Sequence, residues 1–383
     1  MKQDTCIIYY HGNAWDGVPA RQRYLMQAMA AHVPVIYLDT TEKKKWSVHN
    51  DQVAENITVV RGLIPLVTRF KRRGWNTLMH ASFRWHLRWV REKYERIILW
   101  NADNWLRPQR FISHDFLIFD CIDPSFDEDP TILAHYHQRE QEMLRAADLV
   151  IASADALVDE CHKSHRDVIL INNACEPAEY DAALLAQAAK PNWWPAATQR
   201  VVAYLGTLDY RVDFSMLAAA AANNPDLTFI YAGAVPPELN DRVAALQKIP
   251  NVLCPGLISV DAGRYLLSRC SVGLIPFRAN AMNDAINPVK MYAYALLGKP
   301  VVGTNIRELR DRPDIVHTAD TAEAFSAAVR RAIYQSEDAA HRRHLQQFAA
   351  ENTWTHRAQL AWDEIQNRLE SAAQPPLTVG GPA

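Results

Sequence analysis

Hydrophobic positions along this chain form short apolar runs that alternate with segments of helical periodicity. Residues 6–10 predict a buried strand, residues 20–31 place apolar side chains on one helical face, and residues 33–38 predict the next strand. A strand, a helix and a strand in this order make a βαβ unit, which implies a parallel sheet. Further strands are predicted at residues 57–60, 96–100, 116–120, 149–152 and 168–171.

A second series of the same kind follows an interruption at residues 177–198, which contains Lys-Pro-Asn-Trp-Trp-Pro and is typical of a linker between domains. Its strands are predicted at residues 201–205, 227–231, 252–253, 272–275 and 300–303. Its helices are predicted at residues 213–223, 262–270, 322–334 and 337–351, and a last amphipathic helix at residues 354–370. We therefore expect an α/β protein of two doubly wound, Rossmann-like domains, over residues 1–176 and 199–350, with ligands bound at the carboxyl ends of the strands.

Composition indicates an ordinary soluble protein of 383 residues with a net charge of −2, which gives no indication of a nucleic-acid partner. No apolar window is long enough for a transmembrane helix, and the N-terminus lacks the pattern of a signal peptide. The six cysteines are scattered without a CxxC pair, as in a cytoplasmic protein with reduced thiols. The tail of residues 371–383, rich in Pro and Gly, is predicted to be disordered.

Residues 287–303 carry the strongest chemical signal. The pattern predicts a helix that opens at Pro288 and closes at Gly298, followed by a buried strand. Lys290 then lies in the first helical turn, where backbone N–H groups and the helix dipole attract anions. The stretch therefore predicts a phosphate site, although the local pattern also fits an ordinary helix with a solvated lysine.

The same stretch resembles the nucleotide-sugar signature of GT-B glycosyltransferases, Pro-x-Lys-hydrophobic-x-Glu-Tyr-x-Ala-x-Gly-x-Pro-Val-Val. The matching residues are Pro288, Lys290, Tyr294, Gly298, Pro300, Val301 and Val302. In that family the lysine contacts the diphosphate and the glutamate binds the ribose, but Ala293 stands at the glutamate position here. Retaining members carry a Glu-x7-Glu pair, and this chain has Ala285 and Ala293 at those positions, which favours inversion by direct displacement.

The resemblance extends to bacterial polysaccharide glycosyltransferases similar to the teichuronic-acid and xanthan-assembly enzymes. The elements that carry it are residues 11–23, 119–123, 146–157, 173–176 and 204–213. It implies a GT-B architecture with two domains facing a cleft and a last helix, over residues 351–370, that crosses back to the N-terminal domain. It also implies a nucleotide-sugar donor, UDP-linked, bound by the C-terminal domain, and a surface-polysaccharide or lipid-linked glycan acceptor bound by the N-terminal domain.

Donor-binding residues are expected around Lys290 in the C-terminal domain. Gly206 follows a predicted strand and would let phosphate approach the backbone. Arg211 and Arg278 are further cationic candidates, and Phe277 and Tyr294 are candidates to flank the base, although surface-charge and core roles remain open for Arg278 and Phe277. The full predicted set is Gly206, Thr207, Arg211, Phe277, Arg278, Pro288, Val289, Lys290 and Tyr294.

The acceptor base is expected in the N-terminal domain. Asp120 and Asp123 follow a predicted strand, and the matching element of xanthan-type relatives supplies their proposed base, at the position of Asp123. A turn aspartate before Pro124 is the alternative, and Asp16 in the first loop is the rival base. The acceptor-binding candidates are His11, Trp15, Arg21 and Asp120.

Neither a metal nor another cofactor is expected. Asp127, Glu128 and Asp129 resemble the Asp-x-Asp of GT-A transferases, but they precede a predicted helix start at Pro130, as a solvated acidic run does. The histidines show no ligand spacing. The GT-B layout replaces the metal with basic groups and helix dipoles.

Charge is concentrated in residues 43–96, which hold thirteen Lys or Arg against four Asp or Glu. Basic residues alternate there with Trp and Phe, as in Arg84-Trp85-His86-Leu87-Arg88-Trp89, and such a segment suits the surface of an anionic membrane. A solvated helix that buries its aromatic residues is the alternative. We expect a glycosyltransferase at the inner face of the cell membrane, with a non-catalytic nucleotide-sugar-binding or scaffold protein as the second hypothesis, favoured by Ala293.

Overall fold

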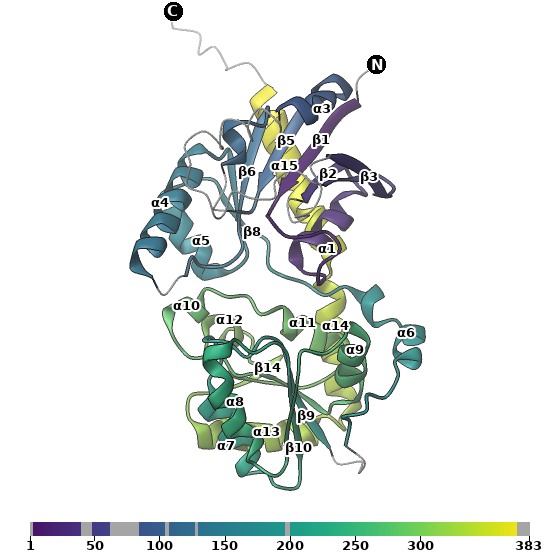
Figure 1. The fold of residues 1–383 in the computed structure, drawn as a ribbon, viewed down its shortest axis with the longest axis vertical. Coiled ribbons are helices and arrows are strands. Elements are labelled where there is room, and N and C mark those ends of the chain that lie inside the picture. Colours follow the sequence, from purple (N-terminus) through teal and green to yellow (C-terminus); the bar gives the residue numbers. More distant parts are fainter. Residues whose placement is uncertain are drawn as a thin grey trace, which may run out of the picture. The chain divides into compact units, whose positions relative to one another are not determined.

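The computed structural model of this protein describes residues 3–39, 48–61, 84–103, 107–126, 129–195 and 200–373. The chain divides into two compact units (Figure 1). Unit 1 comprises Met1–Ala152, Cys161–Ile171 and Trp354–Ala383, and unit 2 comprises Ser153–Glu160 and Asn172–Thr353. The C-terminal segment thus groups with the N-terminal half of the sequence.

Unit 1 contains an eight-stranded sheet in the order β3-β4-β2-β1-β5-β6-β7-β8. All neighbouring strands are parallel except β3 and β4, which are antiparallel. The strands are β1 (Gln3–Tyr10), β2 (Val35–Asp39), β3 (His49–Ala54), β4 (Ile57–Arg61), β5 (Tyr94–Asn101), β6 (Phe116–Cys121), β7 (Leu149–Ala152) and β8 (Val168–Leu170). Its helical elements include α1 (Arg21–Met29), α3 (Arg88–Lys93), η1 (Pro108–Arg110), α4 (Pro130–Ala146) and α15 (Trp354–Ala373), while α5 (Asp155–His162) spans residues of both units.

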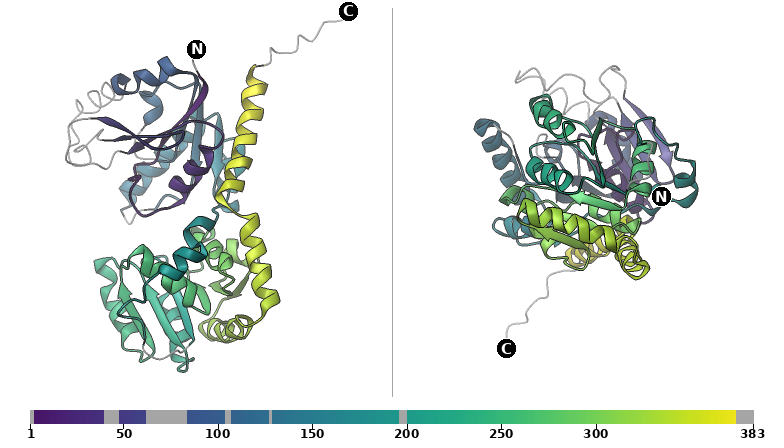
Figure 2. Two further views of the ribbon diagram at one scale, coloured as in Figure 1. Left: turned by 90° about the vertical axis from the view of Figure 1, so that its right-hand side faces the viewer. Right: turned by 90° about the horizontal axis from the view of Figure 1, so that it is seen from below.

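The apolar runs of the sequence explain the centre of this sheet, because β1, β2, β5 and β6 are buried along most of their length. Helices α1 and α15 pack together, as Figures 1 and 2 show, and the rings of Tyr24 and Trp354 stack with centroids 6.3 Å apart. Farther along α15, Arg368 forms an ion pair with Asp167 at 2.6 Å. These contacts attach the last helix to unit 1.

Unit 2 contains a six-stranded parallel sheet in the order β11-β10-β9-β12-β13-β14. The strands are β9 (Val201–Leu205), β10 (Thr228–Ala232), β11 (Val252–Gly256), β12 (Val272–Ile275), β13 (Val301–Thr304) and β14 (Val316–Ala319). Its longer helices are α7 (Phe214–Ala222), α8 (Asn240–Gln247), α9 (Val260–Arg269), α11 (Val289–Leu296), α13 (Ala322–Gln335) and α14 (Ala339–Glu351). The sequence predicted this alternation of strands and helices except for α8 and β14.

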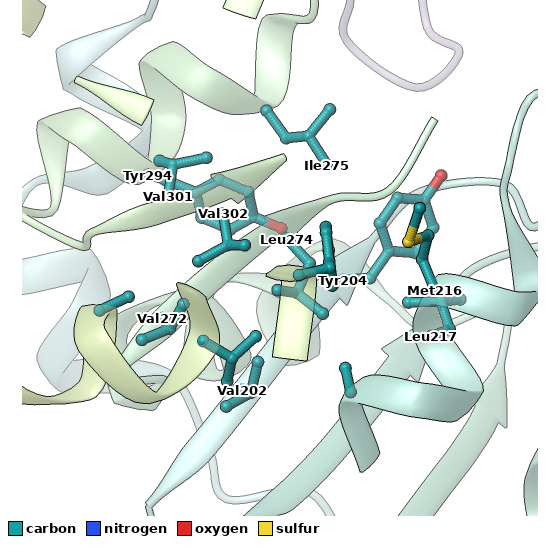
Figure 3. Close-up of a cluster of buried hydrophobic side chains, with 14 of the residues drawn as sticks. Val202, Tyr204, Met216, Leu217, Val272, Leu274, Ile275, Tyr294, Val301 and Val302 are labelled. Atoms are coloured by element: carbon teal, nitrogen blue, oxygen red, sulfur yellow. The ribbon is translucent and has the colours of Figure 1, made fainter. Parts of the chain in front are cut away.

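The core of unit 2 surrounds Tyr294, which is 1% exposed and lies among Val202, Leu274, Val301 and Val302 (Figure 3). Its hydroxyl donates to the carbonyl of Ala203 at 3.2 Å. A Cβ at Gly273 would overlap the Tyr294 ring, so the absence of a side chain there lets α11 pack closely on β12. This packing fixes the position of α11 on the sheet.

No helix among the described residues is long and apolar enough to span a membrane. The six cysteines all fall within the described ranges, and none forms a disulfide there. Part of the predicted basic segment, residues 43–47 and 62–83, lies outside the described residues, as do Asp127, Glu128 and the end of the tail, residues 374–383.

Candidate functional site

Lys290 occupies the second position of helix α11, whose N-cap is Pro288 in an extended conformation. Its ammonium nitrogen lies 5.3 Å from the ring centroid of Tyr204 and 5.4 Å from that of Phe277. Both rings are buried, and each presents an electron-rich face to the cation. Tyr204 is near the end of β9 and Phe277 follows β12, so the lysine is held at the carboxyl edge of the unit 2 sheet.

Gly206 follows β9 directly and touches the lysine side chain. A Cβ built on Gly206 would lie 2.7 Å from the ammonium nitrogen of Lys290 and would overlap its Cε. The φ angle of Gly206 is +156°, a conformation that other residues rarely adopt. Thr207 comes next, and its carbonyl accepts a hydrogen bond from the Tyr204 hydroxyl at 2.8 Å. The glycine therefore leaves room for the Lys290 side chain beside the end of β9, and a positive charge at a helix N-terminus suits a phosphate group.

The two arginine candidates lie on neighbouring segments. Arg211 forms a bidentate pair with buried Asp209, with Nε and Nη2 donating at 3.0 and 2.5 Å. Its backbone carbonyl accepts from the N–H of Arg278, and Arg278 Nε donates to the Val212 carbonyl at 3.3 Å. The carboxylate of Asp209 offsets part of the positive charge of Arg211.

The aromatic candidates lie below the surface. Tyr294 is 1% exposed and Phe277 is 3% exposed, so neither presents a free ring face for a base to stack on. Tyr294 belongs to the core described above, and Phe277 supports Lys290 from beneath. Among the remaining predicted donor residues, Pro288 is buried at the helix start and Val289 is 43% exposed.

A buried polar network that was not predicted from the sequence fixes the start of α11. Asn287, 2% exposed, accepts from the backbone N–H of Asn173 at 3.0 Å and donates to Glu308 Oε2 at 2.5 Å. Glu308 also accepts from the N–H of Asp155 at 3.0 Å and from Arg312 at 3.2 Å. Burial raises the pKa of the Glu308 carboxyl group, and the nearby Arg312 charge opposes that rise.

Exposed apolar side chains follow β11 at the carboxyl edge of the unit 2 sheet. Leu257 is 79% exposed and Val260 is 49% exposed. Between them, Ser259 caps helix α9 by accepting from the N–H of Ala262 at 3.2 Å. Exposed apolar groups of this kind offer a surface on which a flat ring can pack. This loop was not predicted from the sequence, because two isolated apolar residues in a polar segment carry no periodic signal.

Asp120 and Arg21 in unit 1 form a buried ion pair rather than an open binding site. The Arg21 guanidinium lies 3.1 Å from Asp120 and donates to the Ile171 carbonyl at 2.8 Å. Trp100 Nε1 donates to the other Asp120 oxygen at 3.2 Å, and the side chains of the pair are 3% and 0% exposed. The pair thus fixes the carboxyl end of β6 to helix α1 and to the end of β8.

His11, Trp15 and Asp16 lie in the loop after β1. Nδ1 of His11 is buried and has no hydrogen-bond partner among the described residues, and burial lowers the pKa of this imidazole against the opposing charge of Asp120. Trp15 is buried against Tyr37, at 5.1 Å between ring centroids. The Asp16 side chain is 72% exposed and pairs with Arg61 at 2.8 Å.

Asp123 is exposed on the loop after β6. Strand β5 alone separates β6 from β1, so Asp123 and His11 both belong to the carboxyl edge of the unit 1 sheet. Asp129, the described member of the acidic run, caps helix α4 by accepting from the N–H of Thr131 at 2.8 Å. Within the described ranges, no group of three or more His, Cys, Asp or Glu side chains is arranged to hold a metal ion.

The two doubly wound sheets define the class of this protein, which is the GT-B fold. A sucrose-phosphate synthase from Thermosynechococcus elongatus superposes with a TM-score of 0.73 at 15% identity, over 97% of this chain and 100% of that chain. A trehalose-6-phosphate enzyme from E. coli bound with UDP-2-fluoro glucose superposes with a TM-score of 0.66 at 12% identity, over 95% and 99%. The predicted fold class is therefore confirmed. Such low identities establish the fold alone.

Among curated proteins, the chain is similar to TuaH of Bacillus subtilis (strain 168), which is named as a teichuronic acid biosynthesis glycosyltransferase. The two are 26% identical over 208 residues, and the match covers 51% of each, so it spans about half the length of that relative. No protein-family model matches the chain. The named relative and the structural neighbours agree with the resemblance found in the sequence.

Proposed function

We propose that this protein is a glycosyltransferase that uses a nucleotide-sugar donor, UDP-linked, and that unit 2 binds the donor diphosphate. The observation that carries the proposal is the contact between Lys290 and Gly206, which places a positive charge in the first turn of α11 at the carboxyl edge of the sheet. Direct displacement would break the bond from the anomeric carbon to the diphosphate, and the leaving group would gain negative charge. The Lys290 ammonium would stabilise that charge in the transition state.

We propose Asp123 as the base that takes the proton from the acceptor hydroxyl as its oxygen attacks the anomeric carbon. Its exposed position at the carboxyl end of β6 supports this role, and Asp16, which pairs with Arg61 in the loop after β1, is the rival candidate. Attack from the side opposite the diphosphate inverts the anomeric configuration and uses no metal. A structural neighbour, a trehalose-6-phosphate synthase, was studied for glycosyl transfer with retention, so product stereochemistry decides this point.

We further propose that the acceptor is a surface polysaccharide or a lipid-linked glycan and that the protein works at the membrane surface. The likeness to a teichuronic acid glycosyltransferase supports the class of acceptor. The basic segment of residues 43–96 supports the location at the membrane surface. The structure describes residues 48–61 and 84–96 of this segment.

A non-catalytic nucleotide-sugar-binding or scaffold protein remains the second candidate function. It is favoured by Ala293, because helix α11 carries no acidic residue that could bind the ribose hydroxyls. Calorimetry of the purified protein against UDP, GDP and ADP, and then against sugars of the preferred nucleotide, tests the donor site shared by both functions. Tight binding of UDP-sugars supports the proposal, and the absence of any binding would exclude both candidates.

A further inference from the structure

Unit 1 contains a cavity of about 540 Å³ on one face of its sheet. Its floor is apolar and is formed by Ile8 of β1, Ile97 of β5, Leu87, Phe111 and Ile112. Side chains alternate between the faces of a strand, so Ile8 and Ile97 point away from the face that carries Tyr9 and Trp100. The cavity thus lies on the opposite face of the sheet from the Arg21–Asp120 pair, away from the acceptor candidates.

Four arginines, Arg84, Arg88, Arg91 and Arg110, line the same cavity, and no acidic residue lines it within the part of the chain that the structure describes. Arg91 pairs with Asp115 at 2.6 Å, Arg88 with Glu92 at 3.5 Å and Arg110 with Glu142 at 4.0 Å. These acids lie outside the lining, and the Arg88–Glu92 pair is exposed, so water screens it strongly. The cavity therefore carries positive charge above an apolar floor.

Two further groups point to the nature of an occupant. Gln109 lines the cavity, and its Oε1 is buried and accepts no hydrogen bond from a described residue, so a hydroxyl that reached it would satisfy this oxygen. Trp85 is 66% exposed between Arg84 and Leu87 of the lining. An exposed tryptophan beside arginines is typical of a protein surface that meets a membrane interface.

We propose that this cavity binds one anionic phospholipid with a hydroxylated headgroup, and that this lipid seats unit 1 on the membrane. The arginines would contact the phosphate, Gln109 would accept from a headgroup hydroxyl, and the floor would cover the first part of the acyl chains. The volume falls in the range of roughly 300–1,000 Å³ that is usual for pockets for small ligands. The proposal deepens the membrane location proposed above but does not depend on sugar transfer, since Lys290 and Asp123 take no part.

The test uses the full chain and short-chain lipids below their critical micelle concentrations. Calorimetry compares dihexanoyl phosphatidylglycerol, dihexanoyl phosphatidylcholine, which has the same chains without net charge, and glycerol 3-phosphate, which has the anion without chains. We expect saturable binding of the phosphatidylglycerol alone. If the choline lipid binds equally well, the cavity recognises only the apolar chains. If glycerol 3-phosphate binds equally well, it recognises only the anion. Either result overturns the proposal.

Variants locate the binding. The double substitution Arg84→Gln with Arg88→Gln should weaken binding of the phosphatidylglycerol at least tenfold, while Arg145→Gln, an exposed arginine at the end of α4, should leave it unchanged. Arg84 and Arg88 are themselves exposed, so the double variant should keep its melting temperature. Undiminished binding by the double variant, or binding of an acidic peptide in preference to the lipid, would refute the proposal. A protein that binds lipid but transfers no sugar would leave it intact.

Discussion

Replacing Lys290 with alanine should weaken the binding of UDP by a calculable amount. The ammonium lies in the first turn of α11, over the rings of Tyr204 and Phe277 and against Gly206, so it is half-buried and positioned before the ligand arrives. A hydrogen bond to a charged group contributes about 1.5–3 kcal/mol. At about 1.4 kcal/mol for each factor of ten, the dissociation constant for UDP should rise roughly 10- to 150-fold.

Isothermal titration calorimetry measures this change directly. Lys290→Met keeps most of the aliphatic stem and removes the charge, so it should lose nearly as much affinity as Lys290→Ala. Lys248→Ala removes an exposed lysine at the end of α8 in the same unit and should have no effect. UMP, with one phosphate fewer, should be less sensitive to the substitution than UDP. An unchanged dissociation constant for UDP in Lys290→Ala would refute the assignment of the diphosphate to this lysine.

Three further predictions concern other residues of the two units. Asp123→Asn should lower turnover by about 100-fold or more and leave UDP affinity unchanged, because a base acts on the acceptor and not on the nucleotide; near-normal turnover would move the role elsewhere. Tyr294→Phe should lower the free energy of unfolding by about 1 kcal/mol through loss of the bond to Ala203, as measured by urea denaturation, and a change in UDP affinity instead would restore Tyr294 as a donor residue. Burial lowers the pKa of His11 below its ordinary value of 6.5, so the unfolded chain binds the proton more tightly than the folded protein does. The folded protein therefore loses stability as the pH falls below about 6.5. His11→Asn should therefore reduce the loss of stability between pH 7.5 and pH 5.5, and an equal loss in both proteins would show that His11 does not cause it.

Periodicity alone predicted most of the sheet architecture, and it failed at two edges. Strand β3 has an exposed, polar sequence, and β14 contains His317 and Thr318, so neither forms the apolar run that marks a central strand. Both strands lie at an edge of their sheet, where one side lacks a neighbouring strand. A pattern based on hydrophobicity is weak at such positions.

In the candidate site, too, some features were predictable from the sequence and others were not. The position of Lys290 in the first turn of α11 follows from Pro288 and the apolar helix, so the sequence was sufficient. The burial of Tyr294 was not predictable from the motif, because it depends on Gly273 in a neighbouring strand. In the network of Asn287, Asn173 and Glu308, the first two residues lie 114 positions apart in the sequence. No local spacing indicates such a pairing.

The most direct test of the account is donor cleavage by the purified protein. Release of UDP from a panel of UDP-sugars is followed with and without a lipid-linked or polysaccharide acceptor, in the wild-type protein and in Lys290→Ala and Asp123→Asn. We predict that one UDP-sugar is cleaved, that an acceptor accelerates the release of UDP, and that both variants are strongly impaired. A protein that binds a UDP-sugar tightly but releases no UDP with any acceptor would contradict catalysis and would support the non-catalytic role that Ala293 favours.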